Sequence, residues 1–123
     1  MIEQKEQSFL EAVAKDLATF DYAGVCNIAI PCNTSHYFMK KLQAMTDINI
    51  INMVDETAKY IRERYGESAK VAILATDGTV NTGIYQKSLA NYNLLPYIPN
   101  GNEGCSCVVL GCTELLALIL AAK

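Results

Sequence analysis

Short apolar runs alternate with helical patterns along almost the whole chain, and this alternation limits the fold more than any other feature. Between the runs, apolar side chains recur at helical spacing, as in the amphipathic helix predicted over residues 3–20. Strands that alternate with helices form a mostly parallel sheet covered by helices. We therefore expect an α/β fold, a three-layer α/β/α single lobe with a mostly parallel sheet of about five strands. The predicted strands cover residues 25–30, 48–53, 71–75, 93–98 and 105–110.

With 123 residues, the chain is long enough for one hydrophobic core, so we predict a single domain over residues 1–123. Asp55 is the predicted N-cap of one helix, and residues 76–82 are a predicted polar loop. Residues 100–104 are a short connection for a parallel crossover, which needs about a dozen residues or more. Either the last two strands are antiparallel neighbours, or a second copy supplies the missing helices. Further helices are predicted over residues 35–45, 55–65, 83–92 and 114–122.

Two stretches, residues 25–34 and 105–114, share one pattern: an apolar strand, Pro or Gly, then a cysteine with small polar residues that open a helix. Unpaired N–H groups and the helix dipole favour a thiolate at such a position. Because a free thiol has a pKa of about 8.5, a modest decrease brings it near neutral pH. Cys32 and Cys112 are therefore a candidate acid/base pair, with inert buried thiols as the alternative.

The remaining composition excludes several classes of protein. The net charge of −3 is small and mixed, which indicates neither a nucleic-acid partner nor a membrane surface. An odd number of cysteines, with no leader and no membrane-length apolar run, predicts a reducing, cytoplasmic setting. We expect no metal site, because the chain has one histidine and Cys105 and Cys107 alternate within an apolar strand. Those two cysteines and Cys26 are predicted to pack within strands.

Three motifs together resemble the aspartate/glutamate racemase family, and the aspartate racemases in particular. They are PCNTSH at residues 31–36, LATDGTVNTGIY at 74–85 and LGCTEL at 110–115, and they occur in the family's order. The resemblance implies a racemase, an isomerase that needs no cofactor, acting on a small acidic amino acid such as aspartate or glutamate. It also implies that Cys32 and Cys112 exchange a proton with the α-carbon, one as thiolate base and the other as thiol acid.

The same resemblance assigns roles to the polar residues around the thiols. Short donors that hold the substrate carboxylates are expected, with helix capping as the alternative. Two further side chains are expected to support the thiols. Glu114 orients the second thiol, or only stabilises the helix as an acidic residue in its first turn. His36 biases Cys32 toward thiolate, or only lies on the helix surface or packs in the core. The expected substrate-binding residues are Asn33, Thr34, Thr76, Thr79 and Thr113.

Members of this family are longer, fold as two similar lobes and begin with a glycine-rich loop, so this chain is expected to be a truncated or minimised member, or a short natural relative. Apolar surface left uncovered by the missing segments favours association, and we expect a homodimer. A catalytically inactive racemase-derived scaffold or binding domain is the alternative function. A thiol redox protein is disfavoured because the chain has no Cys-x-x-Cys pair.

Overall fold

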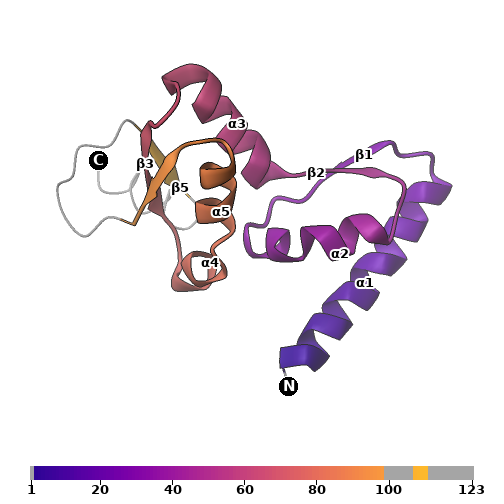
Figure 1. Ribbon diagram of the computed structural model, residues 1–123. Coiled ribbons are helices and arrows are strands. Elements are labelled where there is room, and N and C mark those ends of the chain that lie inside the picture. Colours follow the sequence, from indigo (N-terminus) through magenta and orange to yellow (C-terminus); the bar gives the residue numbers. More distant parts are fainter. Residues whose placement is uncertain (1, 99–106, 111–123) are drawn as a thin grey trace, which may run out of the picture. The chain divides into compact units, whose positions relative to one another are not determined.

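The computed structural model describes residues 2–98 and 107–110, and it contains five parallel strands in two small sheets (Figure 1). The chain divides into two compact units, which we describe separately. Unit 1 lies within Met1–Pro31 and Phe38–Asn52, and unit 2 lies within Cys32–Tyr37 and Met53–Lys123. The prediction of a single domain stays a prediction. No helix in the described part of the chain is long and apolar enough to cross a membrane.

Unit 1 contains two short parallel strands and two helices that contact each other. The ring of Phe9 on the first helix and the ring of Phe38, the residue directly before the second, have their centroids 5.6 Å apart. Its buried side chains come from both helices, from β2 and from the residue before β2: Leu17, Leu42, Ile48 and Ile50. Its elements are α1 (Ile2–Tyr22), β1 (Asn27–Ala29), α2 (Met39–Ala44) and β2 (Asn49–Ile51). The 3-10 helix η1 (Thr34–Phe38), which precedes α2 in the chain, belongs to unit 2 except for Phe38.

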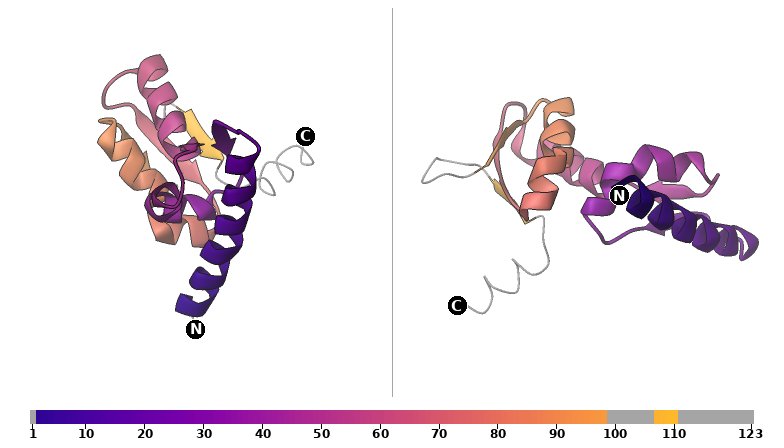
Figure 2. Two further views of the ribbon diagram at one scale, coloured as in Figure 1. Left: turned by 90° about the vertical axis from the view of Figure 1, so that its right-hand side faces the viewer. Right: turned by 90° about the horizontal axis from the view of Figure 1, so that it is seen from below.

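Unit 2 has a three-stranded parallel sheet in the order β4-β3-β5, and α3 and α5 lie against one face of it (Figure 2). Leu89 of α5 is completely buried, and it belongs to the same core cluster as Ala58 of α3 and Val71 and Ile73 of β3. The elements of unit 2 are α3 (Met53–Tyr65), β3 (Lys70–Leu74), α4 (Asp77–Thr82), α5 (Ile84–Asn91), β4 (Leu95–Tyr97) and β5 (Cys107–Leu110).

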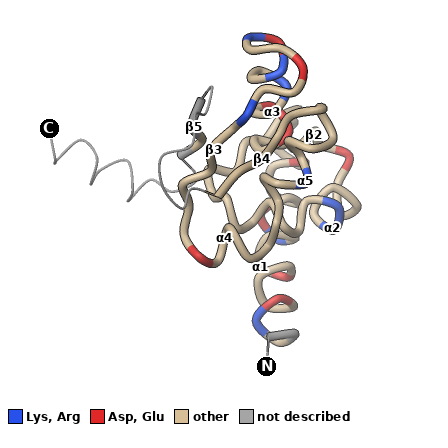
Figure 3. Tube along the Cα trace, turned by 60° about the vertical axis from the view of Figure 1, so that its left-hand side comes forward, with Lys and Arg blue, Asp and Glu red and all other residues tan. Residues whose placement is uncertain are grey.

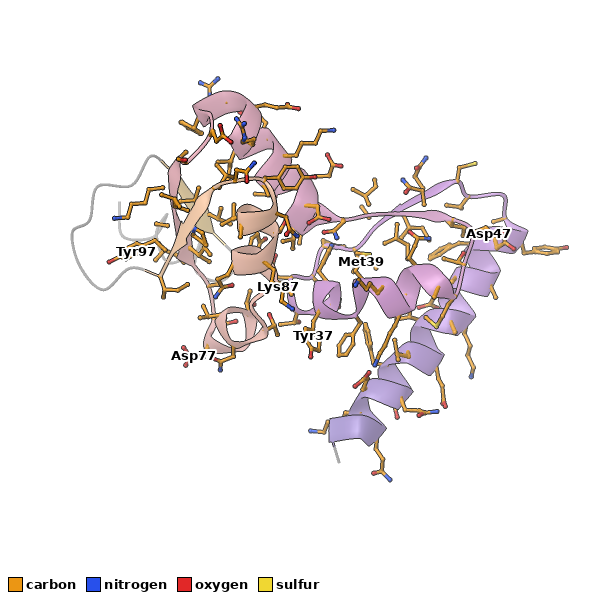
Figure 4. The ribbon with its side chains drawn as sticks, viewed as in Figure 1. Tyr37, Met39, Asp47, Asp77, Lys87 and Tyr97 are labelled. Carbon is orange, nitrogen blue, oxygen red and sulfur yellow. The ribbon has the colours of Figure 1, made fainter. Side chains whose placement is uncertain are left out.

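Charged side chains at the two ends of α3 match the helix dipole. Asp55 and Glu56 occupy its first turn, and Arg62 and Arg64 occupy its last turn, as Figure 3 shows by colour. This distribution stabilises a helix because its N-terminal end carries partial positive charge and its C-terminal end partial negative charge. At the sheet edge, Lys70 Nζ of β3 lies 4.9 Å from the ring centroid of Tyr97 on β4 (Figure 4), a cation–π contact.

The α/β class and the parallel pairing are confirmed, and all five strands are present, divided between two sheets. The antiparallel alternative for the last two strands is wrong. β4 and β5 lie on opposite sides of β3, and both are parallel to it, so they are not neighbours. The helix predicted over 114–122 lies outside the described residues.

Several predicted boundaries are wrong for local reasons. α3 begins at Met53, so Asp55 is inside the first turn rather than at the N-cap. Its carboxylate accepts a hydrogen bond from Ser88 Oγ at 2.5 Å, which joins α3 to α5. The predicted loop at 76–82 is the helix α4, which ends at Gly83 with φ of +69°, a left-handed conformation that glycine adopts without strain.

The first strand also differs from its prediction. A strand covered on both faces was expected, but in β1 only Ile28 is half-buried, while its neighbours Asn27 and Ala29 are exposed. Cys26 is exposed as well, so the prediction that it packs within a strand is wrong. The reason is that only three residues of this run pair with β2, and the chain turns directly before them at Gly24.

Candidate functional site

The segment that carries Cys32 closes into the 3-10 helix η1, and the thiol lies at its opening. His36 N–H donates to the Asn33 carbonyl at 3.1 Å, which makes the first turn. Cys32 Sγ lies 3.4 Å from Thr34 Oγ1. Cys32 lies one residue before the capping position, Asn33, and its thiol faces hydroxyl and backbone N–H groups of Thr34 and Ser35, at the start of the turn.

Hydrogen-bond donors around the thiol lower its pKa. The largest contribution is the Ser35 hydroxyl, followed by the Thr34 hydroxyl, and the backbone N–H groups of Ser35 and Thr34 add to it. Partial burial opposes these donors but does not outweigh them, so the pKa of the Cys32 thiol is below its ordinary value. Because Cys32 is exposed, a thiolate formed there is open to reagents from solution.

Removing the donor hydroxyls is therefore expected to raise the pKa of the Cys32 thiol. Ser35→Ala should raise it more than Thr34→Val, because the Ser35 hydroxyl is the larger stabiliser of the thiolate. The measurement is the iodoacetamide alkylation rate of the Cys32 peptide against pH by mass spectrometry. A raised pKa moves the midpoint of that profile to higher pH.

Cys26 is an internal control for this experiment, because it is also an exposed free cysteine in the same chain. Its alkylation should be the same in wild type, Ser35→Ala and Thr34→Val. A Cys32 profile that stays unchanged in both variants would show that the hydroxyls do not stabilise the thiolate.

Two buried side chains hold the Cys32 segment in place. The Tyr85 hydroxyl of α5 donates to Asn33 Oδ1 at 2.6 Å, and burial raises the pKa of Tyr85. His36 is 6% exposed, and its ring contacts the carbonyl oxygen of Cys32 and the backbone N–H of Met53. His36 thus contacts the backbone of Cys32 and not its thiol, and its predicted role as a support of Cys32 stays a prediction.

The predicted threonine pair lies beyond the carboxyl end of β3 and caps α4. Thr76 is the N-cap residue, and its Oγ1 accepts from the backbone N–H of Thr79 at 3.4 Å and lies 3.3 Å from Thr79 Oγ1. Thr79 is buried, whereas Thr76 is exposed. Asp77, the next residue in this motif, is exposed and points away from α4 (Figure 4). Thr76 thus acts as a helix cap in this structure, and Thr79 supplies the backbone N–H that it caps.

The structure brings four of the predicted residues into one segment: Cys32, Asn33, Thr34 and His36. It places Thr76 at the N-cap of α4 and Thr79 within that helix, and Cys112, Thr113 and Glu114 lie outside the described residues. Among the described residues, no group of three or more His, Cys, Asp or Glu side chains is arranged to hold a metal ion. Sequence reasoning missed Tyr85 and Met53 as partners of the thiol segment. Tyr85 ends one of the quoted motifs, but its hydrogen bond depends on where α5 packs.

A comparison with protein families matches residues 1–103 to the family described as Asp/Glu/hydantoin racemase. The chain belongs to this racemase family. Among curated relatives, a broad-specificity amino-acid racemase of Bacillus subtilis (strain 168) is 32% identical over 79 residues, which are 64% of this chain and 34% of that protein.

Two solved structures support the racemase fold of the chain. One is an aspartate racemase homologue from Pyrococcus horikoshii OT3, with a TM-score of 0.65 and 26% identity over 74% of this chain and 39% of that one. The other is an aspartate racemase of Picrophilus torridus, with a TM-score of 0.62 and 31% identity over 74% of this chain and 38% of that one. The chain thus spans between a third and two fifths of the length of these relatives.

Proposed function

We propose that this chain carries the thiol centre of a cofactor-independent amino-acid racemase. The observation that supports this proposal is the environment of the Cys32 thiol. The thiol is exposed, and the hydroxyl and backbone N–H groups of Thr34 and Ser35 lower its pKa. Racemisation requires a base that removes the α-proton and an acid that returns a proton on the opposite face. A thiol whose pKa lies near the working pH suits both roles, because it is populated in both protonation states.

The second thiol in this proposal is Cys112. The strand register pairs Leu74 of β3 with Leu110 of β5, so the two strands end at the same level. Thr76 and Cys112 each follow these paired residues by two positions in the sequence. This register supports a second thiol at the same edge of the sheet as Thr76, with Glu114 two residues further on as its support.

In the proposed reaction, one sulfur is a thiolate and takes the α-proton, which leaves a carbanion stabilised by the neighbouring carboxylate. The opposite thiol then gives its proton to the other face of the α-carbon. The product has inverted configuration, and the two sulfur atoms have exchanged protonation states. Proton transfers of this kind contribute about 10²- to 10⁴-fold to a rate.

The proposed substrate is a small acidic amino acid. Its carboxylates accept hydrogen bonds, for which the thiol segment and α4 provide hydroxyl, amide and backbone donors. Tyr85 donates to Asn33 Oδ1, and this fixes the amide so that Nδ2 is its donor side. The proposed carboxylate-binding residues are Asn33, Thr34, Thr76, Thr79 and Thr113.

The test is exchange of the α-proton in heavy water, followed by NMR. Purified protein is incubated separately with L-aspartate, L-glutamate and L-alanine. We expect exchange with one or both acidic amino acids, accompanied by formation of the D-enantiomer, and little with alanine. A folded protein that exchanges none of them would instead support a racemase-derived scaffold or binding domain, in line with the chain's partial coverage of its relatives.

We also propose that the chain acts in the cytoplasm as a homodimer. Exposed apolar side chains on the strands of both sheets support association, among them Ile51 at 38% and Leu95 at 53% exposure. Sedimentation velocity over a range of concentrations tests the assembly. A single species with the mass of one chain at every concentration would contradict it.

The hydrogen bond between Tyr85 and Asn33 yields a separate prediction. Tyr85→Phe removes the hydroxyl while it keeps the ring in the core, so Asn33 loses its orienting donor. We expect kcat/KM for the acidic substrate to fall about three- to tenfold, since one neutral hydrogen bond contributes about 1 kcal/mol. Steady-state kinetics measure this loss. Tyr60→Phe is the matched control because Tyr60 is 61% exposed, and an equal loss in both variants would contradict the role of Tyr85.

A further inference from the structure

His36 is the chain's single histidine, and both of its ring nitrogens contact backbone groups. Nδ1 lies 2.8 Å from the carbonyl oxygen of Cys32, and the backbone N–H of Met53 donates to Nε2 at 3.2 Å. A carbonyl oxygen only accepts, and a backbone N–H only donates. The two bonds together therefore require a proton on Nδ1 and a bare Nε2, which is the neutral Nδ1–H tautomer.

The partner of Nε2 belongs to the first residue of α3. N–H groups at the start of a helix have no acceptor within the helix, and His36 supplies one to Met53. α3 is itself fixed by Val54, Ala58 and Ile61, which are buried in the core of unit 2. The ring thus joins the peptide group that follows the Cys32 thiol to a helix anchored in that core.

This arrangement differs from an imidazole that acts directly on a thiol. Because Nδ1 and Nε2 are both engaged with the backbone, neither nitrogen is available to take the proton of Cys32 Sγ. What the ring fixes is the carbonyl of Cys32, and the backbone N–H groups of Thr34 and Ser35 that face the thiol follow directly in the chain. Holding that carbonyl keeps those donors directed at the sulfur.

We infer that His36 is a positioning residue that, as the neutral Nδ1–H tautomer, clamps the Cys32 carbonyl to the start of α3 and so holds the donor turn around the thiol. Its effect on racemisation rests on the proposed function. Its tautomer and its effect on thiol reactivity do not, so they can be measured whether or not the protein exchanges α-protons.

The first test is ¹⁵N NMR of the imidazole in wild-type protein with any affinity tag removed. Because the chain has one histidine, both ring nitrogens are assigned without further variants. We expect a protonated Nδ1 and an unprotonated Nε2 at neutral pH. A protonated Nε2, or two nitrogens averaged by tautomer exchange, would overturn the inference.

The second test compares two substitutions that each remove one of the bonds. An asparagine amide reaches about as far as Nδ1, so His36→Asn keeps a donor for the Cys32 carbonyl and loses the acceptor for Met53. A glutamine amide reaches about as far as Nε2, so His36→Gln keeps the acceptor and loses the donor. The readout is the pH profile of Cys32 alkylation, with Cys26 as the internal control.

We expect His36→Gln to move the alkylation midpoint of Cys32 to higher pH and His36→Asn to leave it close to wild type. In the exchange assay, kcat should fall about three- to tenfold in His36→Gln, the contribution of one hydrogen bond. Equal profiles in both variants would show that the ring only caps α3 or fills space. If the wild type itself exchanges no α-protons, the proposed function fails, while the NMR and alkylation results still decide the role of His36.

Discussion

Cys32→Ala is expected to reduce α-proton exchange of an acidic amino acid by about 10²- to 10⁴-fold, the range that a positioned acid or base contributes. The thiol has four donors around it and a lowered pKa, and alanine removes the only atom that can carry the proton at that position. Cys112→Ala should cause a loss of similar size, because the second face of the α-carbon then lacks its acid. Exchange rates in heavy water at saturating substrate measure both losses.

The matched control is Cys26→Ala. Cys26 is an exposed free cysteine like Cys32, but its Sγ lies near the carbonyl oxygen of Gly24, at 3.7 Å, in the turn before β1. A carbonyl accepts hydrogen bonds and gives a thiolate no stabilisation. Cys26→Ala should keep full exchange activity. Retained exchange in Cys32→Ala, or an equal loss in the Cys26 variant, would contradict the proposed role of the Cys32 thiol.

Sequence periodicity was sufficient to predict the elements of this fold whose signals are local. The amphipathic spacing predicts both ends of α1 to within two residues. The apolar run at 71–75 corresponds to β3, whose Val71 and Ile73 are in the core. The pattern at 76–82 was misread because Gly78 and Asp77 indicate a loop when taken alone. In the structure, Thr76 caps this segment and Gly83 ends it, so the two ends make it a helix.

The strand pairing could not be predicted from local signals. Residues 25–30 have the composition of a buried strand, yet only Asn27–Ala29 pair with β2, and the exposure of a strand depends on which elements cover it. Likewise, the order β4-β3-β5 follows from contacts between residues that are far apart in sequence. The short connection at 100–104 suggested an antiparallel pair because sequence reveals its length and does not reveal its path.

The candidate site shows the same division. The residues of the thiol segment were identifiable because Cys32, Asn33 and Thr34 are consecutive and carry recognisable chemistry. The partners that hold this segment come from two helices further along the chain. Met53 of α3 is 17 residues from His36, and Tyr85 of α5 is 52 residues from Asn33. Nothing in the sequence near Met53 or Tyr85 indicates those bonds. They arise because both helices pack on the same sheet face.

That packing leads to the largest expected change in stability. Leu89→Ala should lower the free energy of unfolding by about 2–5 kcal/mol, because Leu89 has no exposed surface and its removal leaves a cavity that the sheet and α3 fill only in part. Lys59→Ala is the control: Lys59 is exposed on α3, so the change should be within about 0.5 kcal/mol. Urea denaturation followed by circular dichroism measures both changes.

Hydrogen exchange of the β3 amides measures the loss of stability within unit 2 alone. β3 is suited to this because it is the central strand, hydrogen-bonded to both β4 and β5. Leu89→Ala should speed exchange of those amides by about 30-fold or more, which corresponds to the lower limit of the expected loss. The amides of β2, which belong to unit 1, serve as the reference. Unchanged protection of β3 in Leu89→Ala would contradict the expectation that the packing of Leu89 stabilises the sheet.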